Sequence, residues 1–127
     1  MKDNRLEDYL AHMREAARDA VGFVQGMTRQ DFQQDKRTQQ AVVMSLVILG
    51  EAATQLMDRH GAFCEARPQI PWRNMRGMRN RIAHGYFSID FDVVWDTVSQ
   101  ALPQLLDELE RLRGDTDLPP SSSSSAL

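Results

Sequence analysis

The sequence predicts an all-α fold, a bundle of about four main helices with short helical turns between them. Apolar residues recur at alternating spacings of three and four over long segments, which is the period of one helix face, and no run alternates as a strand would. The chain has 127 residues, 42% of them hydrophobic, which is enough for one domain with a buried core. We expect this domain to span residues 1–113, and the polar, serine-rich residues 114–127 to form a disordered tail.

The first helix is predicted to begin near residue 4 and to end near the glycine at position 26. Asn4 is the expected N-cap, with Glu7 three residues later as in a capping box. The apolar stripe of this helix consists of Leu6, Leu10, Met13, Ala17, Ala20 and Val24. A second capping signature, Thr28 followed by Asp31, then predicts a short helical turn.

The next long helix is predicted from about Lys36 to His60, and Gly61 is placed to end it. Apolar side chains cover most of its circumference. They are Val42, Val43, Leu46, Val47, Ile48, Leu49, Ala53 and Leu56. A helix of this kind lies either at the centre of a bundle or at an oligomer interface, and the sequence leaves both arrangements open.

Two further helices are predicted in the second half of the chain. The dipeptide Pro71-Trp72 is typical of the start of a helical turn, a helix follows over residues 73–84, and Gly85 is placed to terminate it. Asp90 is the expected cap of the last helix. Its apolar residues are Val94, Val98, Ala101, Leu105, Leu109 and Leu112. Pro103 falls inside this pattern and should kink the helix or begin a new turn.

The composition excludes several classes of protein. The longest apolar stretch, residues 41–50, is far shorter than the roughly 20 residues of a membrane-spanning helix, and the polar first ten residues predict no secretory signal. Cys64 is the single cysteine, so an internal disulfide and a cysteine-based zinc cluster are excluded. We therefore expect a reduced, cytoplasmic protein that contacts no membrane.

The net charge is −3, but the charges are unevenly distributed. The window from 66 to 88 contains five arginines and no acidic residue, so it carries +5 while the remainder of the chain carries −8. These arginines are Arg67, Arg73, Arg76, Arg79 and Arg81. Such a group on an acidic protein is typical of an anion site, and RNA or a nucleotide phosphate is the main cellular anion of that kind. Ion pairs with the acidic remainder explain the charge pattern equally well.

His84 follows Arg79 by five residues, near the end of this window. A histidine can take the proton of a ribose 2′-hydroxyl, and an arginine can stabilise charge on the phosphate, so the pair needs no metal ion or other cofactor. On one straight helix, however, the two side chains would point about 140° apart. They meet if the helix unwinds at Gly85, or across a two-fold dimer in which Gly77 permits a close approach. By itself, this short pattern favours a structural histidine at the helix C-terminus.

Residues 79–86, RNRIAHGY, resemble the R-x4-H-x-Y motif of the HepT-like toxins, which are HEPN-domain ribonucleases. The resemblance extends to LGEAA at 49–53, IPWRNMRGMRN at 70–80 and FDVVWDTVSQALPQLLDEL at 91–109, in the same order, and covers about residues 4–112. It implies an all-α HEPN-type bundle that forms a homodimer with the active site at the interface. It also implies a partner, a minimal nucleotidyltransferase (MNT) antitoxin encoded alongside.

Position by position, the resemblance implies Arg79 and His84 as the catalytic pair of a metal-independent ribonuclease. It implies Tyr86 as the tyrosine to which the antitoxin attaches AMP. A phenolic oxygen is a nucleophile for the α-phosphate of ATP, and the added negative charge would neutralise the arginines and block RNA. The chain departs from the usual pattern at Gly85, where a larger residue is often found, and this would loosen the loop that positions Tyr86.

Three further residues are candidates for the same site. Glu51 follows a strongly apolar stretch, so we expect it to be partly buried, either orienting Arg79 or another arginine of the site or forming an ordinary ion pair. Asn80 either hydrogen-bonds the substrate or caps a neighbouring backbone group. Arg76 either shares the phosphate contact or is a general surface cation.

Two functions from different classes follow from these residues. The leading one is a ribonuclease toxin of a type II toxin–antitoxin system, neutralised by AMP addition to Tyr86. The alternative is a non-catalytic nucleotide-binding or adaptor subunit of a nucleotidyltransferase complex, in which the arginines bind ATP or an acidic surface of the partner. A nuclease activity that depends on His84 distinguishes the two.

Overall fold

The computed structural model describes residues 4–117, and all regular structure in this part of the chain is helical, which confirms the predicted all-α class. The long helices are α1 (Asn4–Phe23), α3 (Lys36–Arg59), α5 (Trp72–His84) and α7 (Leu102–Asp117). The shorter elements are α2 (Arg29–Gln33), α4 (Gly61–Glu65), α6 (Phe91–Asp96), the 3-10 turn η1 (Tyr86–Ser88) and the π-helical segment η2 (Thr97–Ala101).

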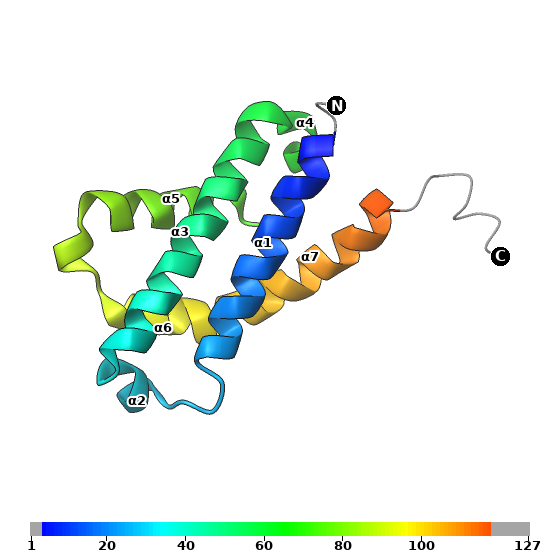
Figure 1. Ribbon diagram of the computed structural model, residues 1–127. Coiled ribbons are helices and arrows are strands. Elements are labelled where there is room, and N and C mark those ends of the chain that lie inside the picture. Colours follow the sequence, from blue (N-terminus) through cyan, green and yellow to red (C-terminus); the bar gives the residue numbers. More distant parts are fainter. Residues whose placement is uncertain (1–3, 118–127) are drawn as a thin grey trace.

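The long helices lie in the order α5, α3, α1, α7 (Figure 1). α1 and α3 run antiparallel and side by side, and α7 packs against α1. α5 packs across α3, and its C-terminal half extends beyond the bundle at the left of the figure. The end of α5 and the η1 turn therefore lie at one edge of the molecule.

The core is formed largely by the predicted apolar stripes, although Ile48 and Ala101 of those stripes are exposed and Phe32 and Ile70 join the core from outside them. Its largest fully buried side chains are Phe32, Leu10, Met13, Leu56, Ile70, Leu109, Val42, Val94 and Val98. The Phe32 ring lies against Phe91 and Trp95, with ring centroids 6.2 and 5.5 Å apart, so aromatic packing ties α2 to α6. The buried Trp72 donates from Nε1 to the Cys64 carbonyl at 3.1 Å, which anchors the start of α5.

Several helix ends follow the predicted capping signatures. The hydroxyl of Thr28 accepts from the backbone N–H of Asp31 at 3.1 Å, and the Asp31 carboxylate accepts from the backbone N–H of Thr28 at 3.0 Å. Asp90 caps α6, because its Oδ1 accepts from the second and third backbone N–H groups after it, at 2.9 and 3.3 Å. Gly26 has φ +80°, a left-handed conformation that favours glycine, and Gly85 ends α5 as predicted.

Asp35 caps α3, although we did not predict this cap. Its carboxylate accepts from the backbone N–H of Thr38 at 3.0 Å and from the Thr38 hydroxyl at 2.8 Å. These two hydrogen bonds hold the pKa of the Asp35 carboxyl below its ordinary value, since they stabilise the charged form.

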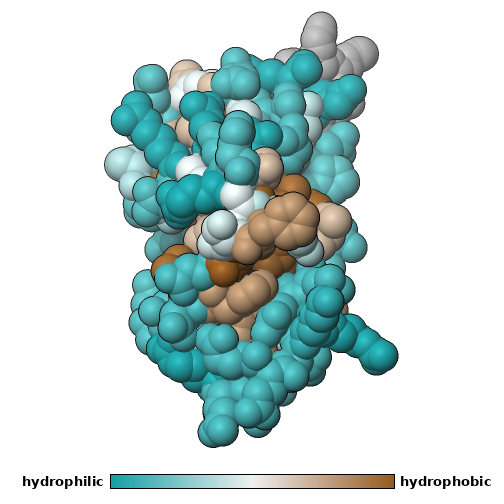
Figure 2. Space-filling model, turned by 90° about the vertical axis from the view of Figure 1, so that its left-hand side faces the viewer, coloured by the Kyte–Doolittle hydropathy of each residue, from teal (hydrophilic) through white to brown (hydrophobic). Residues whose placement is uncertain are grey.

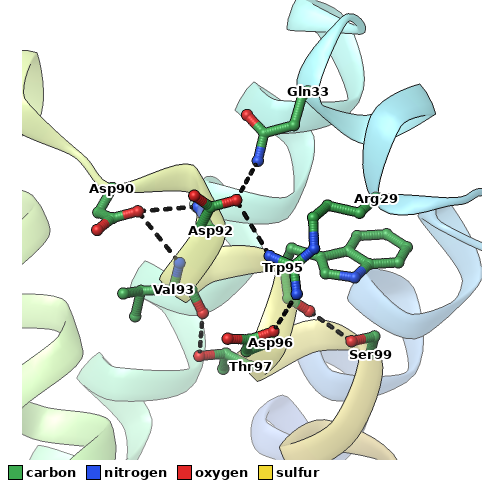
Figure 3. Close-up of polar contacts among 9 residues, drawn as sticks. All are labelled: Arg29, Gln33, Asp90, Asp92, Val93, Trp95, Asp96, Thr97 and Ser99. Carbon is green, nitrogen blue, oxygen red and sulfur yellow. Dashed lines mark hydrogen bonds and ion pairs between the residues drawn. The ribbon is translucent and has the colours of Figure 1, made fainter.

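A polar cluster joins α2 to α6 on the outside of the aromatic packing (Figure 3). Arg29 donates from Nη1 to Asp92 at 3.0 Å and from Nη2 to Asp96 at 2.9 Å. Gln33 donates to the same oxygen of Asp92 at 2.9 Å. The hydrogen bonds to Asp92 and then to Asp96 raise the pKa of the Arg29 guanidinium. We call Arg29, Gln33, Asp92 and Asp96 the Arg29 cluster.

The connection after α3 is more helical than expected. α3 ends at Arg59, and Gly61, which was expected only to end it, begins the short α4. The reason is local: the His60 carbonyl accepts from the N–H of Cys64 at 3.2 Å, which continues helical hydrogen bonding past the glycine.

The last helix is interrupted before Pro103, as predicted. The five residues of η2 are π-helical, because a proline has no N–H for the carbonyl one turn earlier. α7 then continues to Asp117, past the expected domain end at residue 113, since a single glycine at 114 costs a helix only about 1 kcal/mol. From residue 118 on, the expected disordered tail lies outside the described residues.

Among residues 4–117, α3 is the one helix that is long and apolar enough to cross a membrane by length and composition. Half of its most apolar window is buried inside the bundle. The central helix of a folded bundle has the same character, so this feature gives only weak support for a membrane span.

Candidate active site

The candidate residues lie on α5, which is held against α3 by a close approach at Gly50. A Cβ atom at Gly50 would lie 2.4 Å from Cβ of Arg79 and 2.7 Å from the carbonyl oxygen of Met75. A side chain at this position would therefore push the two helices apart. Met75 and Ile82 are buried on the same side of α5, so packing fixes the position from which Arg79 extends.

Arg79 is bound by two side chains of α3. It donates from Nη1 to Glu51 Oε1 at 2.7 Å and from Nη2 to Thr54 Oγ1 at 3.3 Å. Its side chain is only 24% exposed, and its buried Nε has no hydrogen-bond partner among the described residues. The expected partial burial of Glu51 is wrong, because its side chain is 51% exposed at the surface of α3. Its ion-pair partner is Arg79. Thr54 was missed, because nothing in its sequence neighbourhood distinguishes it from other threonines.

His84 is exposed in the last turn of α5, and its Nδ1 lies 2.9 Å from the backbone carbonyl oxygen of Asn80. A carbonyl oxygen can only accept, so Nδ1 of the neutral ring carries the proton and Nε2 carries the free lone pair. Asn80 therefore contributes through its backbone, and its side chain is exposed. This arrangement leaves His84 ready to accept a proton at Nε2.

The structure does not bring Arg79 and His84 together within one chain. α5 remains helical through His84 and ends at Gly85, so the helix does not unwind to turn the histidine back toward the arginine. Arg79 is directed to α3, whereas His84 contacts its own helix. A Cβ atom added at Gly77 would meet Nη1 of Arg81 at 3.5 Å, the one atom within 4 Å outside the neighbouring helix backbone, so α5 has open space beside this position.

Tyr86 lies in the η1 turn directly after α5, and its side chain is 49% exposed. Its ring is edge-on to that of Phe87, with centroids 5.8 Å apart. Phe87 itself is 99% exposed. Figure 2 views this edge of the bundle and shows hydrophobic side chains gathered across its middle, between two hydrophilic areas. The modification candidate therefore stands on an exposed, partly apolar edge.

The arginines of the 66–88 window do not form one free cationic surface. Arg76 pairs with Asp58 of α3 at 3.3 Å, and Arg67 lies 3.8 Å over the Phe63 ring. Arg73 and Arg81 are exposed, and no acidic side chain of the described residues pairs with either. Ion pairs thus account for part of the window, whereas the anion site stays a prediction.

We find neither a reactive thiol nor a metal-binding cluster among the described residues. Burial raises the pKa of the Cys64 thiol to about 11, so it is protonated and unreactive near neutral pH. Within residues 4–117, no group of three His, Cys, Asp or Glu side chains is placed to hold a metal ion.

The chain is similar to proteins that are named as ribonucleases. A family model described as "Ribonuclease HepT-like" matches residues 13–112. "Probable ribonuclease HepT" of Thermococcus cleftensis is 38% identical over 107 residues, which cover 84% of this chain and 94% of that protein. "Putative RNase MJ0127" of Methanocaldococcus jannaschii is 34% identical over 117 residues, which cover 92% of this chain and 94% of that protein. No solved structure matches the chain significantly.

Proposed function

The chain belongs to the HepT-like ribonuclease family, and from this membership we propose that it is the toxin of a type II toxin–antitoxin system. In this proposal it cleaves RNA in the cytoplasm at a site that contains Arg79 and His84. The observation that carries the proposal is the exposed His84, whose Nδ1 is tied to the Asn80 carbonyl at 2.9 Å and whose Nε2 is left free.

The chemistry assigned to His84 is proton transfer. Nε2 takes the proton of a ribose 2′-hydroxyl, and the 2′-oxygen forms a bond to the adjacent phosphorus. The bond from phosphorus to the 5′-oxygen of the next nucleotide breaks, and that oxygen receives a proton from the imidazolium. The products are a 2′,3′-cyclic phosphate and a 5′-hydroxyl, and no metal ion is required for the proton balance.

The role assigned to Arg79 is to stabilise the negative charge that grows on the phosphate oxygens. Glu51 and Thr54 hold the guanidinium at the α3–α5 crossing, which supports a preorganised position. Arg76 is assigned a supporting phosphate contact, and the Asn80 side chain a contact to the substrate.

We propose that the complete site forms between two copies of the chain. Arg79 and His84 point to different sides of α5, so a second copy is needed to place the His84 of one beside the Arg79 of the other. The exposed Met44 and Ile48 lie one turn apart on α3, and Glu51 lies on the following turn, which supports a contact surface next to the site. Sedimentation of Ile48→Glu tests this, with Phe23→Glu on α1 as the matched exposed control.

Tyr86 is the proposed acceptor of AMP from a minimal nucleotidyltransferase antitoxin. Its oxygen forms a bond to the α-phosphorus of ATP, pyrophosphate leaves, and the phenolic proton passes to solvent. The 49% exposure of Tyr86 and its place two residues after His84 support both access to the hydroxyl and a block of the site once modified. Intact-mass measurement after co-expression with the antitoxin, with Tyr86→Phe as the control, tests this role.

The deciding experiment is cleavage of end-labelled RNA in the presence of EDTA by unmodified wild type, Arg79→Ala and His84→Ala. The exposed Arg37→Ala on α3 is the control for a general loss of positive charge. Cleavage by wild type and the control only, with cyclic-phosphate ends, supports the proposal. If unmodified wild type cleaves no RNA, the proposal is wrong and the nucleotide-binding or adaptor function is favoured instead.

A further inference from the structure

A cavity of about 420 Å³ lies between the N-terminal end of α3 and the segment that follows α5. Its size is within the range of pockets that hold small ligands. Tyr86 and Phe87 belong to its aromatic lining, which we call the aromatic wall, and Gln34, Lys36 and Gln40 belong to its polar lining, the polar wall. We call this space the Phe87 cavity.

The aromatic wall has no packing explanation within one chain. Phe87 is 99% exposed, although covering an aromatic ring is favourable. Among the described residues, its one ring contact is the T-shaped one with Tyr86, at 5.8 Å between centroids, so nearly all of the Phe87 ring surface remains open. An open aromatic face is the surface on which nucleobases stack.

The polar wall offers hydrogen-bonding groups without acidic charge. Gln34 and Gln40 are exposed, and neither side chain makes a hydrogen bond with the rest of the described chain. Lys36 has no ion pair there, and no Asp or Glu lines the cavity. Amide side chains can pair with the edges of a base, and an ammonium group can pair with a phosphate.

We propose that the Phe87 cavity is a nucleobase subsite, in which a base stacks on Phe87, meets Gln34 or Gln40 at its edge and has its phosphate near Lys36. This assignment rests on the proposed ribonuclease function. Tyr86 lines the cavity, and the proposed catalytic His84 lies two residues before it, so the cavity is close to the proposed site. The nucleobase in this subsite comes from one of two sources. It is either a base of the RNA beside the cleaved bond or the adenine of AMP on Tyr86.

The first test is calorimetric binding of AMP and of ribose 5-phosphate, which carries the same phosphate without a base, to the unmodified full chain. AMP should bind more tightly, and Phe87→Ala should weaken AMP binding by about tenfold while leaving ribose 5-phosphate unchanged. Phe23→Ala is the matched control, since Phe23 is an exposed phenylalanine of α1 outside the cavity. Equal binding of the two ligands, or equal effects of the two variants, overturns the proposal.

A second measurement distinguishes the two sources of the base. Wild type and Phe87→Ala are compared on an oligoribonucleotide and on the same oligoribonucleotide with an abasic position beside the cleaved bond. If the preference for the intact strand disappears in Phe87→Ala, the RNA base occupies the cavity. If the preference persists while AMP binding is weakened, the occupant is the tethered AMP.

Failure of the subsite and failure of the proposed function give different results. Wild-type cleavage without base-dependent AMP binding contradicts the subsite alone, whereas base-dependent binding without cleavage contradicts the ribonuclease function alone. Sedimentation of Phe87→Ala completes the test, because a loss of self-association would assign the open ring to a contact between copies and overturn the subsite.

Discussion

The Arg29 cluster and the ion pair of Arg79 with Glu51, which we call the Arg79 pair, both join two helices through an arginine and a carboxylate. The two arginines differ in the number of carboxylates that they bind. In the Arg29 cluster, each terminal nitrogen of the guanidinium faces its own aspartate, at 3.0 and 2.9 Å (Figure 3). Arg79 has one carboxylate partner, Glu51, at 2.7 Å and a hydroxyl at 3.3 Å, and its Nε has no partner among the described residues.

Because two arginines in ion pairs can differ in this way, the presence of an ion pair does not by itself indicate a function. A phosphate that approached Arg29 would compete with two carboxylates, whereas at Arg79 it would compete with one. Arg79 also lies on the same helix as an exposed histidine, whereas the Arg29 cluster contains no histidine. We therefore expect the Arg79 pair to serve the reaction and the Arg29 cluster to serve the fold.

The largest expected effect is a loss of cleavage rate when Arg79 is neutralised, compared with the same change at Arg29. Arg79→Gln should lower kcat roughly 100- to 1000-fold, because it removes a charge that stabilises the transition state. Arg29→Gln should leave kcat within about twofold of wild type, since its cluster touches no reacting group. Initial rates on one RNA substrate measure both, and equal losses would remove the functional distinction between the two arginines.

A smaller loss is expected when the carboxylates are changed to amides. Glu51→Gln should lower kcat by up to about 100-fold with little change in KM, because a misplaced guanidinium fails mainly in the transition state. Asp96→Asn in the Arg29 cluster is the matched control and should leave both constants unchanged. If Glu51→Gln lowers Tm but leaves kcat intact, Glu51 is a structural ion pair and not a positioning residue.

The helix crossing beneath Arg79 can be tested without touching any charge. Gly50→Ala should destabilise the fold by about 1–3 kcal/mol, because the new methyl group meets Cβ of Arg79 at 2.4 Å. Gly22→Ala in α1 is the control, since nothing lies within 4 Å of its added methyl group, and it should be neutral or slightly stabilising. Urea unfolding of both variants measures this, and a harmless Gly50→Ala would mean that the two helices can separate freely.

The Arg29 cluster should contribute modestly to thermal stability. Arg29→Gln should lower Tm by only about 1–3 °C, because exposed ion pairs gain little over hydration. The difference from wild type should shrink in 1 M salt, where exposed charges are screened. Thermal unfolding at low and high salt checks this, and a salt-independent loss would point to the packing of the Arg29 stem instead of its charge.

The smallest expected effect is a pH-dependent change in Tm from Asp35, whose carboxylate accepts from the backbone N–H and the hydroxyl of Thr38. Folding lowers the pKa of Asp35, so its carboxylate stabilises the fold above the unfolded pKa, and this contribution is lost as pH falls through the folded value. The Tm difference between wild type and Asp35→Ala should therefore be full at pH 6 and shrink below about pH 4. A difference that grows on acidification would contradict this role.

Much of the fold follows from signals that act over a few residues. The Thr28–Asp31 capping box, the Asp90 cap and the glycine after α5 each involve groups no more than four residues apart, and each lies where the sequence predicts. The α4 turn and the extension of α7 to Asp117 differ from the predictions, because both depend on whether a helix continues past a single glycine.

The all-α class, several helix caps and the order of Arg79, His84 and Tyr86 in the family motif follow from the sequence alone. The tertiary structure decided that Glu51 and Thr54 are the partners of Arg79, at sequence separations of 28 and 25 residues, and that the close approach lies at Gly50. It also decided which arginines of the window are paired and where the Phe87 cavity lies. Caps and periodicity are local interactions that a chain displays in order, whereas these contacts exist only once α5 has packed across α3.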